Sequence, residues 1–190
     1  ARKGDVDRLH LAVRSGPRPW FWFSCQMFKE AAVNGQVKIL KYMLVHGIQL
    51  DRPPLDECLC TLCEACDDQD GGAGVVAAAR YLVTQGGADV NKARRRDYKG
   101  PLHICCLRGL SELGASLVDA GADVNCRTTD RCRYTPLHYA CQCGYLEMAR
   151  LFLDHGAQIN AREYGNTFTP LMYAACMGHV ALVTLLLARG

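Results

Sequence analysis

The chain has 190 residues, 49% of them hydrophobic, so it is long enough to bury a substantial core. Its net charge of +3 is too small to indicate nucleic acid or an anionic membrane as a partner, and no apolar run approaches the roughly 18 to 20 residues that span a bilayer. The twelve cysteines avoid turn positions and follow no secretory signal, which indicates reduced thiols in an intracellular protein, cytoplasmic or nuclear.

Six copies of one pattern follow one another along the chain, each with two apolar stretches of helical period separated by a glycine. The first copy is only a back half and the last has no closing loop, so we expect the segment to come from a longer protein. In the third copy a polar, glycine-rich stretch predicts a loop inserted at about 67–74. The predicted boundaries are about 1–16, 17–50, 51–91, 92–125, 126–160 and 161–190.

The motif Thr-Pro-Leu-His is the most distinctive part of the repeated pattern. It occurs at 135–138, and a variant that ends in Met occurs at 169–172. Proline is tolerated in the first turn of a helix, and the preceding threonine can cap that helix with its hydroxyl. A glycine in the left-handed conformation is expected at the end of the helix. The marker glycines stand at 4, 35, 74, 109, 144 and 178, which gives intervals of 31, 39, 35, 35 and 34 by subtraction.

With these motifs the chain resembles the ankyrin-repeat family, in which a period of about 33 residues carries the signature Thr-Pro-Leu-His-x-Ala. The resemblance implies an all-α ankyrin-repeat solenoid, a single domain over 1–190 whose stacked helix-turn-helix units carry projecting β-turn fingers. One helix pair cannot cover its own apolar face, so we expect Leu102, Leu137 and Leu171 to be buried between neighbours. The resemblance also implies that His103 and His138 form hydrogen bonds between repeats.

Seven of the twelve cysteines belong to two overlapping sets. Four take repeat positions where other copies have alanine, and are expected to act as small buried apolar residues: Cys66, Cys105, Cys106 and Cys141. A second set lies in one short stretch and could offer four thiolates to zinc: Cys58, Cys60, Cys63 and Cys66. On a continuous helix, at about 100° per residue, these four would spread around the cylinder. We therefore predict no metal, no cofactor and, because no catalytic constellation emerges, no enzyme.

The family resemblance implies a protein-binding surface formed by the finger tips and the exposed side of each first helix. The domain is expected to act as a monomeric scaffold or adaptor module within a larger protein. The candidate partner-binding residues are Arg96, Asp97, Lys99, Leu107, Arg108, Arg131, Tyr134, Gln142, Cys143, Asn166, Phe168 and Met177. This set has a basic centre and an apolar end, which fits an acidic protein or peptide with an apolar anchor.

Other interpretations stay open at this point. The arginines could form only a solvated face, or they could bind nucleic acid, with an affinity that depends steeply on salt, through Arg94, Arg95, Arg96, Arg108, Arg131 and Arg133. The cysteines could serve a metal or redox sensor. The aromatic stretch that contains Trp20 and Trp22 is a secondary candidate patch if it is exposed, and otherwise packs on the first helices.

Overall fold

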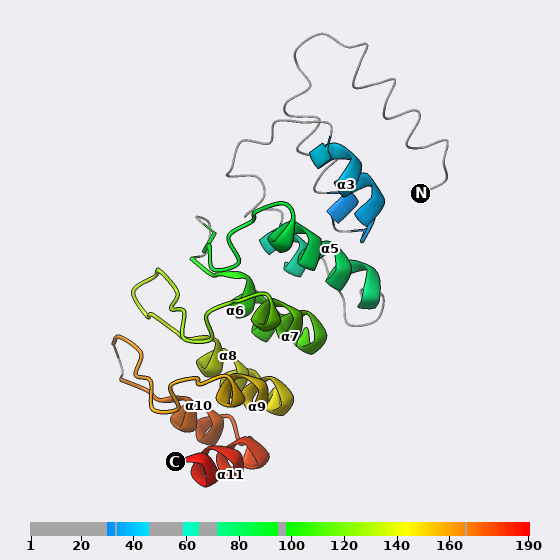
Figure 1. Cartoon of the computed structure of the whole chain (residues 1–190). Helices are drawn as coiled ribbons and strands as arrows, with labels where there is room; N and C mark the ends of the chain where they lie inside the picture. Colours follow the sequence, from blue (N-terminus) through cyan, green and yellow to red (C-terminus); the bar gives the residue numbers. More distant parts are fainter. Residues whose placement is uncertain (1–29, 33, 46–58, 65–71, 95–97, 166) are drawn as a thin grey trace. The chain divides into compact units, whose positions relative to one another are not determined.

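The computed structural model describes residues 30–32, 34–45, 59–64, 72–94, 98–165 and 167–190. The chain divides into two compact units, Ala1–Asp89 and Val90–Gly190 (Figure 1). This boundary lies close to the one predicted between the third and fourth repeats. None of the described helices has the length and apolar character needed to cross a membrane.

The first unit contains helices α3 (Val37–Val45) and α5 (Gly72–Thr84), which contact each other, and shorter helical stretches at 30–32 and 59–64. Leucine and alanine side chains fill its interior, as expected where helices pack closely. The buried residues include Ala31, Ala32, Leu40, Leu59, Leu62, Ala78, Ala79 and Leu82.

The third repeat differs from the prediction at its second helix. Because α5 begins at Gly72, the end of the loop predicted at about 67–74 is helical, and residues 65–71 lie outside the described part of the chain. Gly74 is therefore a residue of α5, where we expected a separator between helices. It lies against Gly35, on which a Cβ atom would come within 2.7 Å of the Gly74 carbonyl carbon. Two glycines thus allow the main chains to approach closely.

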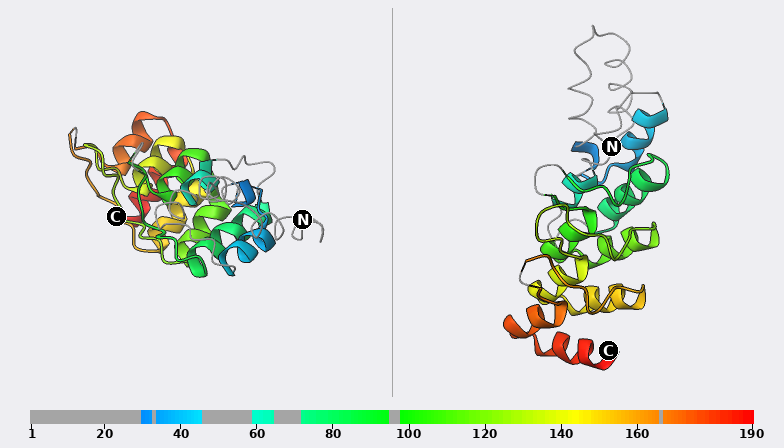
Figure 2. Two further views of the ribbon diagram at one scale, coloured as in Figure 1. Left: turned by 90° about the horizontal axis from the view of Figure 1, so that it is seen from above. Right: turned by 90° about the vertical axis from the view of Figure 1, so that its left-hand side faces the viewer.

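The second unit is a stack of three helix pairs, which lie in successive layers (Figure 2). The first helices contact one another in order, α6 with α8 and α8 with α10, and the second helices do the same, α7 with α9 and α9 with α11. This order confirms the predicted stack for the second unit. The helices are α6 (Pro101–Arg108), α7 (Ser111–Asp119), α8 (Pro136–Cys143), α9 (Leu146–Asp154), α10 (Pro170–Cys176) and α11 (Val180–Arg189).

The first helices begin with proline and are capped in two ways. In α8 the main-chain N–H of Thr135 donates to Nδ1 of His138 at 3.1 Å, and the Thr135 hydroxyl lies 2.8 Å from the same nitrogen. In α10 Met172 takes the place of the histidine, and the Thr169 hydroxyl accepts the Met172 N–H at 3.4 Å. The predicted threonine cap is thus confirmed for α10, whereas histidine takes part in the cap of α8.

The core of the second unit contains most of the predicted residues. Leu102 and Leu137 are buried, at 1% and 0% exposure, and so are Cys105, Cys106 and Cys141. The prediction for Leu171 was wrong, because this side chain is only half-buried. Its helix, α10, packs against α8 on one side and has no further helix pair beyond it among the described residues.

Three loops, which we call fingers, precede the first helices of the second unit: finger 1 (94–99, of which 95–97 are not described), finger 2 (128–134) and finger 3 (163–168, of which 166 is not described). In each, the N–H of the first residue donates to the carbonyl of the last, at 2.9 to 3.2 Å. The residue before the last is left-handed in all three, although none is glycine: Tyr98 (φ 61°), Arg133 (φ 55°) and Thr167 (φ 58°). The three loops therefore share one closing geometry.

Candidate functional site

Neighbouring fingers are joined through their main chains. The N–H of Thr129 in finger 2 donates to the carbonyl of Tyr98 in finger 1 at 3.1 Å, and the N–H of Tyr164 in finger 3 donates to the carbonyl of Cys132 at 2.8 Å. At the finger bases two asparagine side chains each accept a main-chain N–H of the next repeat at 2.8 Å: Asn91 from Asp123, and Asn125 from Gln158. The fingers thus form one continuous row.

His103 and His138 connect each first helix to the next finger. Nδ1 of each ring accepts the N–H of the residue three positions earlier, at 3.1 Å. Nε2 of His103 lies 3.1 Å from the Tyr134 carbonyl, and Nε2 of His138 lies 3.2 Å from the Phe168 carbonyl. A nitrogen that accepts an N–H carries no proton, so Nε2 carries it and donates to the carbonyl. The predicted hydrogen bonds between repeats are confirmed.

Burial maintains the neutral form of both rings. Desolvation lowers the pKa of His103 to about 4 and also lowers the pKa of His138, although backbone hydrogen bonds oppose the shift in each case. A general base or a metal ligand needs a free ring nitrogen, and here both nitrogens of each ring are engaged. These histidines therefore serve the stack.

The repeated helix pairs, the closed fingers and the histidine bridges recur with the period of the sequence pattern. A family model for ankyrin repeats (3 copies) matches residues 62–163 and again 102–190, together more than half of the chain. The chain belongs to the ankyrin-repeat family. No curated protein sequence matches it significantly. Ankyrin repeats are generally protein–protein interaction modules and typically not enzymes, so the exposed residues of the fingers and first helices form the candidate site.

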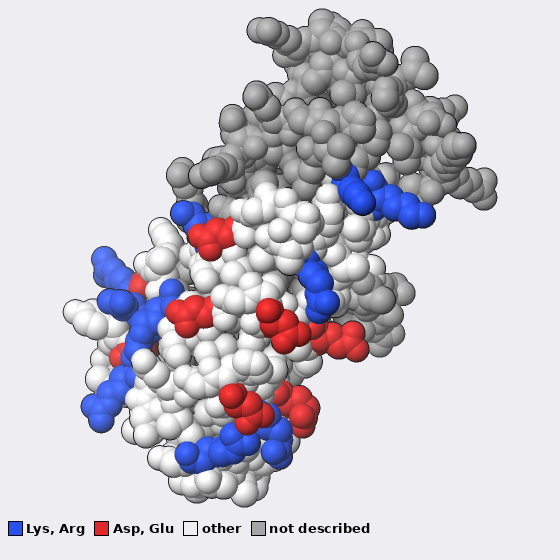
Figure 3. Space-filling model, viewed as in Figure 1, with Lys and Arg blue, Asp and Glu red and all other residues white. Residues whose placement is uncertain are grey.

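The finger arginines, as we call Arg131 and Arg133 of finger 2 and Arg162 directly before finger 3, give this site its charge. Arg131, Arg133 and Arg162 are exposed, and their side chains form no hydrogen bond or ion pair with any other described residue. Two arginines on the second helices are paired instead: Arg150 with Glu147 at 3.7 Å, and Arg189 with Asp154 at 2.8 Å. Figure 3 shows Lys and Arg side chains gathered along the finger edge of this ankyrin stack. The finger charges are available to a partner.

The acidic residue of finger 2 forms no ion pair with these arginines. One carboxylate oxygen of Asp130, Oδ1, accepts the Thr128 hydroxyl at 2.7 Å and the main-chain N–H groups of Cys132 and Arg133 at 3.1 Å. A short side chain that accepts nearby N–H groups in this way stabilises a turn. Asp130 therefore shapes finger 2.

An aromatic group lies where the fingers meet the first helices. The hydroxyls of Tyr134 and Tyr173 are 2.7 Å apart, and the Tyr134 ring lies 5.3 Å from Tyr139 and 5.8 Å from Tyr173. The Phe168 ring lies 5.5 Å from Tyr173. The structure thus brings together two of the candidate residues, Tyr134 and Phe168. Both side chains are half-buried, so only part of each ring is available to a partner.

Glu163 lies close to this aromatic group. Its side chain is 5% exposed, and Oε1 has no hydrogen-bond partner among the described residues. Burial raises the pKa of Tyr134 and of Tyr173, and the nearby Glu163 carboxylate adds to the rise in both. Both phenols therefore stay protonated, and one hydroxyl donates to the other.

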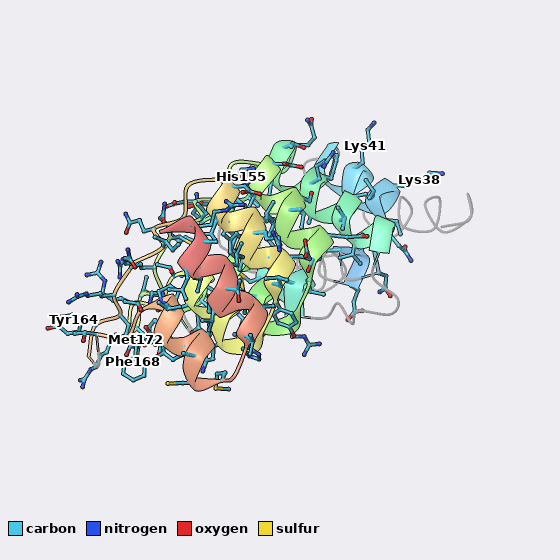
Figure 4. All side chains as sticks on the ribbon, turned by 90° about the horizontal axis from the view of Figure 1, so that it is seen from below. Lys38, Lys41, His155, Tyr164, Phe168 and Met172 are labelled. Atoms are coloured by element: carbon cyan, nitrogen blue, oxygen red, sulfur yellow. The ribbon has the colours of Figure 1, made fainter. Side chains whose placement is uncertain are left out.

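Apolar side chains complete the exposed surface. Leu107 and Met177, both predicted, are 39% and 55% exposed, at the ends of α6 and α10. Tyr164, at 75% exposure, and Met172, at 48%, were not predicted. In Figure 4 the side chains of Tyr164, Phe168 and Met172 project at one edge, from finger 3 and the start of α10. Exposed aromatic and methionine side chains are common at protein interfaces.

The other candidates vary in their exposure. Arg108 is exposed, whereas Lys99, Gln142 and Cys143 are half-buried. The carbonyl of Gln142 lies 3.3 Å from Nε2 of His179, which ties α8 to the next repeat. Several predicted residues lie outside the described part of the chain: Trp20, Trp22, Cys58, Cys66, Arg95, Arg96, Asp97 and Asn166.

The described cysteines are all free thiols. Burial raises the pKa of Cys106, and raises the pKa of Cys126 and of Cys141 to about 12. A protonated thiol is a poor nucleophile and a poor metal ligand, so these three thiols have low reactivity. Within the described residues no group of three or more His, Cys, Asp or Glu could hold a metal ion.

Sequence reasoning missed two arginines of the site, Arg127 and Arg162. Both stand two residues after an asparagine that closes a repeat, in the sequence Asn-x-Arg at 125–127 and at 160–162. This repeated spacing was a usable signal. It places an arginine at the base of finger 2 and another at the base of finger 3, whereas the predicted binding residues lie at the finger tips and on the first helices.

Proposed function

We propose that this ankyrin domain is a non-enzymatic interaction module that holds an acidic protein segment along its fingers and first helices. The observation that supports the proposal is the contrast between unpaired finger arginines, Arg131, Arg133 and Arg162, and the ion-paired arginines of the second helices. Charges that a protein leaves unpaired on one face attract a partner of opposite charge and speed its association.

An apolar anchor in the partner would complete the contact. Leu107, Met172 and Met177 are exposed on the first helices, and Tyr164 is exposed on finger 3. Large apolar and arginine side chains contribute most of the binding energy in typical interfaces. We propose further that the domain acts as a monomeric scaffold or adaptor within a larger intracellular protein, where its free thiols stay reduced.

A quantitative pull-down with matched variants tests the binding face. The face variant combines Arg131→Ala, Leu107→Ala and Met177→Ala. The control combines Arg150→Ala, Leu187→Ala and Val180→Ala, which remove the same kinds of side chain from the second helices. We expect the face variant to lose at least one partner by about tenfold or more, because several interface contacts of roughly 1 kcal/mol or more are removed together.

The comparison requires that both variants fold like the wild-type protein. Circular dichroism and a thermal melt test this for each variant. Equal loss of every partner from the two folded variants would reject the proposed face. Loss from the control alone would move the face to the second helices.

A further inference from the structure

Arg127 brings two other arginines together at the base of fingers 2 and 3. Its Nη1 donates to the carbonyl of Arg133 at 3.2 Å and to the carbonyl of Arg162 at 2.9 Å. One guanidinium therefore bridges the main chains of two neighbouring fingers, and residues 133 and 162 are held side by side. We propose that Arg127, Arg133 and Arg162 form a binding site for the phosphate group of a phosphorylated residue in the partner segment. This inference rests on the proposed function, since the segment delivers the phosphate.

The arginine side chains of this site form no ion pair with a described residue. Both bonds of Arg127 go to carbonyl oxygens, which carry no net charge, and the Arg133 and Arg162 side chains have no acidic partner among the described residues. The acids of fingers 2 and 3 make other contacts, because Asp130 accepts three hydrogen bonds within finger 2 and Glu163 is buried beside the tyrosines. Their charges offset part of the arginine charge nearby.

The field of Arg127 is evident on a neighbouring group. Its charge contributes to the lowered pKa of His138, after the larger effect of burial. The Glu163 carboxylate acts on the same ring in the opposite direction.

A phosphate group fits this site better than a single carboxylate does. A phosphorylated side chain carries a charge of about −1.5 to −2 near pH 7 and presents three acceptor oxygens. Arginine offers a planar fork of donors that binds two such oxygens at once, which the ammonium group of lysine cannot do. A phosphate has acceptors for more than one such fork, whereas a carboxylate has only two oxygens.

Arg133 is the residue before the last of finger 2. The residue is left-handed, at φ 55°, where glycine is free of strain and an ordinary residue is disfavoured by about 1 kcal/mol. Tyr98 and Thr167 are left-handed at the same position of fingers 1 and 3, so this conformation belongs to the finger loop. Arg133 is exposed, so its guanidinium can reach a ligand.

NMR titration of the whole 190-residue chain tests the site directly. The probes are a tripeptide with a central phosphoserine and the same tripeptide with serine, at equal ionic strength. We expect the phosphopeptide to shift the Nε–Hε signals of Arg127, Arg133 and Arg162 in a saturable way and to bind at least about tenfold more tightly than the serine peptide. The signal of Arg150, which is paired with Glu147, serves as the internal control.

Variants separate this site from general charge attraction. Arg133→Gln and Arg162→Gln each remove one exposed guanidinium and should weaken phosphopeptide binding by about tenfold, whereas Arg150→Gln should not change it. Equal shifts with both tripeptides, or equal binding by all three variants, would overturn the proposal. A single-stranded oligonucleotide that displaces the phosphopeptide and binds more tightly at the same salt would also overturn it, in favour of nucleic acid.

The two proposals can fail separately. In one case the face variant loses partners in the pull-down, but the phosphopeptide does not shift the arginine signals. The proposed binding face is then supported and the phosphate site is rejected. If the phosphopeptide binds while the face variant keeps every partner, the phosphate site is real and the extended face is wrong.

Discussion

The third residue of a first helix, where His103 and His138 stand, shows how a single side chain can serve two repeats. In both cases one ring nitrogen caps its own helix and the other bonds to the carbonyl at the end of the next finger. Only the neutral imidazole can accept on one nitrogen and donate from the other. The contact therefore depends on the protonation state of the ring.

His103 should make the stability of the protein depend on pH. Its pKa is lowered to about 4 in the folded state from an ordinary value of 6.5, so below pH 6.5 the unfolded chain binds the proton first. We expect the free energy of unfolding to fall between pH 6.5 and pH 4 by about 3 kcal/mol from this residue. Urea denaturation at about pH 7.5, 6.0 and 4.5 measures the fall.

Two histidine variants supply the comparison. His103→Gln removes the titrating ring, so its stability should be lower near neutral pH but change less on acidification. His155→Gln removes an exposed histidine directly after α9 and serves as the control for the loss of a ring. An unchanged slope in His103→Gln would mean that other groups cause the pH dependence.

At the level of the element, the ends of α6 and α8 are set by glycine and by a ring of the following repeat. Gly144 ends α8 at φ 87°, and a Cβ atom placed on it would lie 2.7 Å from Cε1 of His179. Gly109 ends α6 in the same way, with the Tyr145 ring at 2.8 Å. The helix end thus combines a left-handed residue with a close packing contact.

Gly144→Ala should be more destabilising than a left-handed glycine substitution alone. The conformational strain contributes about 1 to 2 kcal/mol, and displacement of the His179 ring adds to it. Gly156→Ala is the matched control, because Gly156 has φ 81° but a Cβ atom added to it would meet no atom within 4 Å. Thermal and urea denaturation compare the two. Equal losses would show that the His179 contact does not contribute.

For the whole molecule, the repeat pattern predicted most of the fold of the second unit. A helix start marked by Pro136, a helix end marked by Gly144 and a core position such as Leu137 depend on local chemistry that recurs at fixed spacing. Leu171 departs from this rule, because its burial depends on a further neighbouring pair, which local sequence does not encode. The predicted role of Gly74 as a separator between helices was also wrong, because the third repeat does not keep the regular spacing and Gly74 lies within α5.

The candidate site was less predictable than the fold. The exposure of Arg131, Leu107 and Met177 could be predicted from their positions within the repeat. The convergence of Arg127 on two carbonyls depends on how neighbouring fingers are joined, which is a contact between repeats. The same holds for Tyr134, whose hydroxyl bonds to Tyr173 in the next repeat and is not free for a partner.

Cooperation between repeats in the second unit can be measured from Leu137, which is fully buried in α8. Leu137→Ala should lower the free energy of unfolding by about 2–5 kcal/mol through loss of packing and creation of a cavity. Because α8 contacts both α6 and α10, and repeat arrays are stabilised by interfaces between nearest neighbours, the loss should spread to both helices. Amide hydrogen exchange should therefore accelerate in α6 and α10 as well as in α8. Leu187→Ala, at a leucine with 65% exposure, should leave these rates unchanged. Faster exchange confined to α8 would instead show that the interfaces between repeats contribute little to its stability.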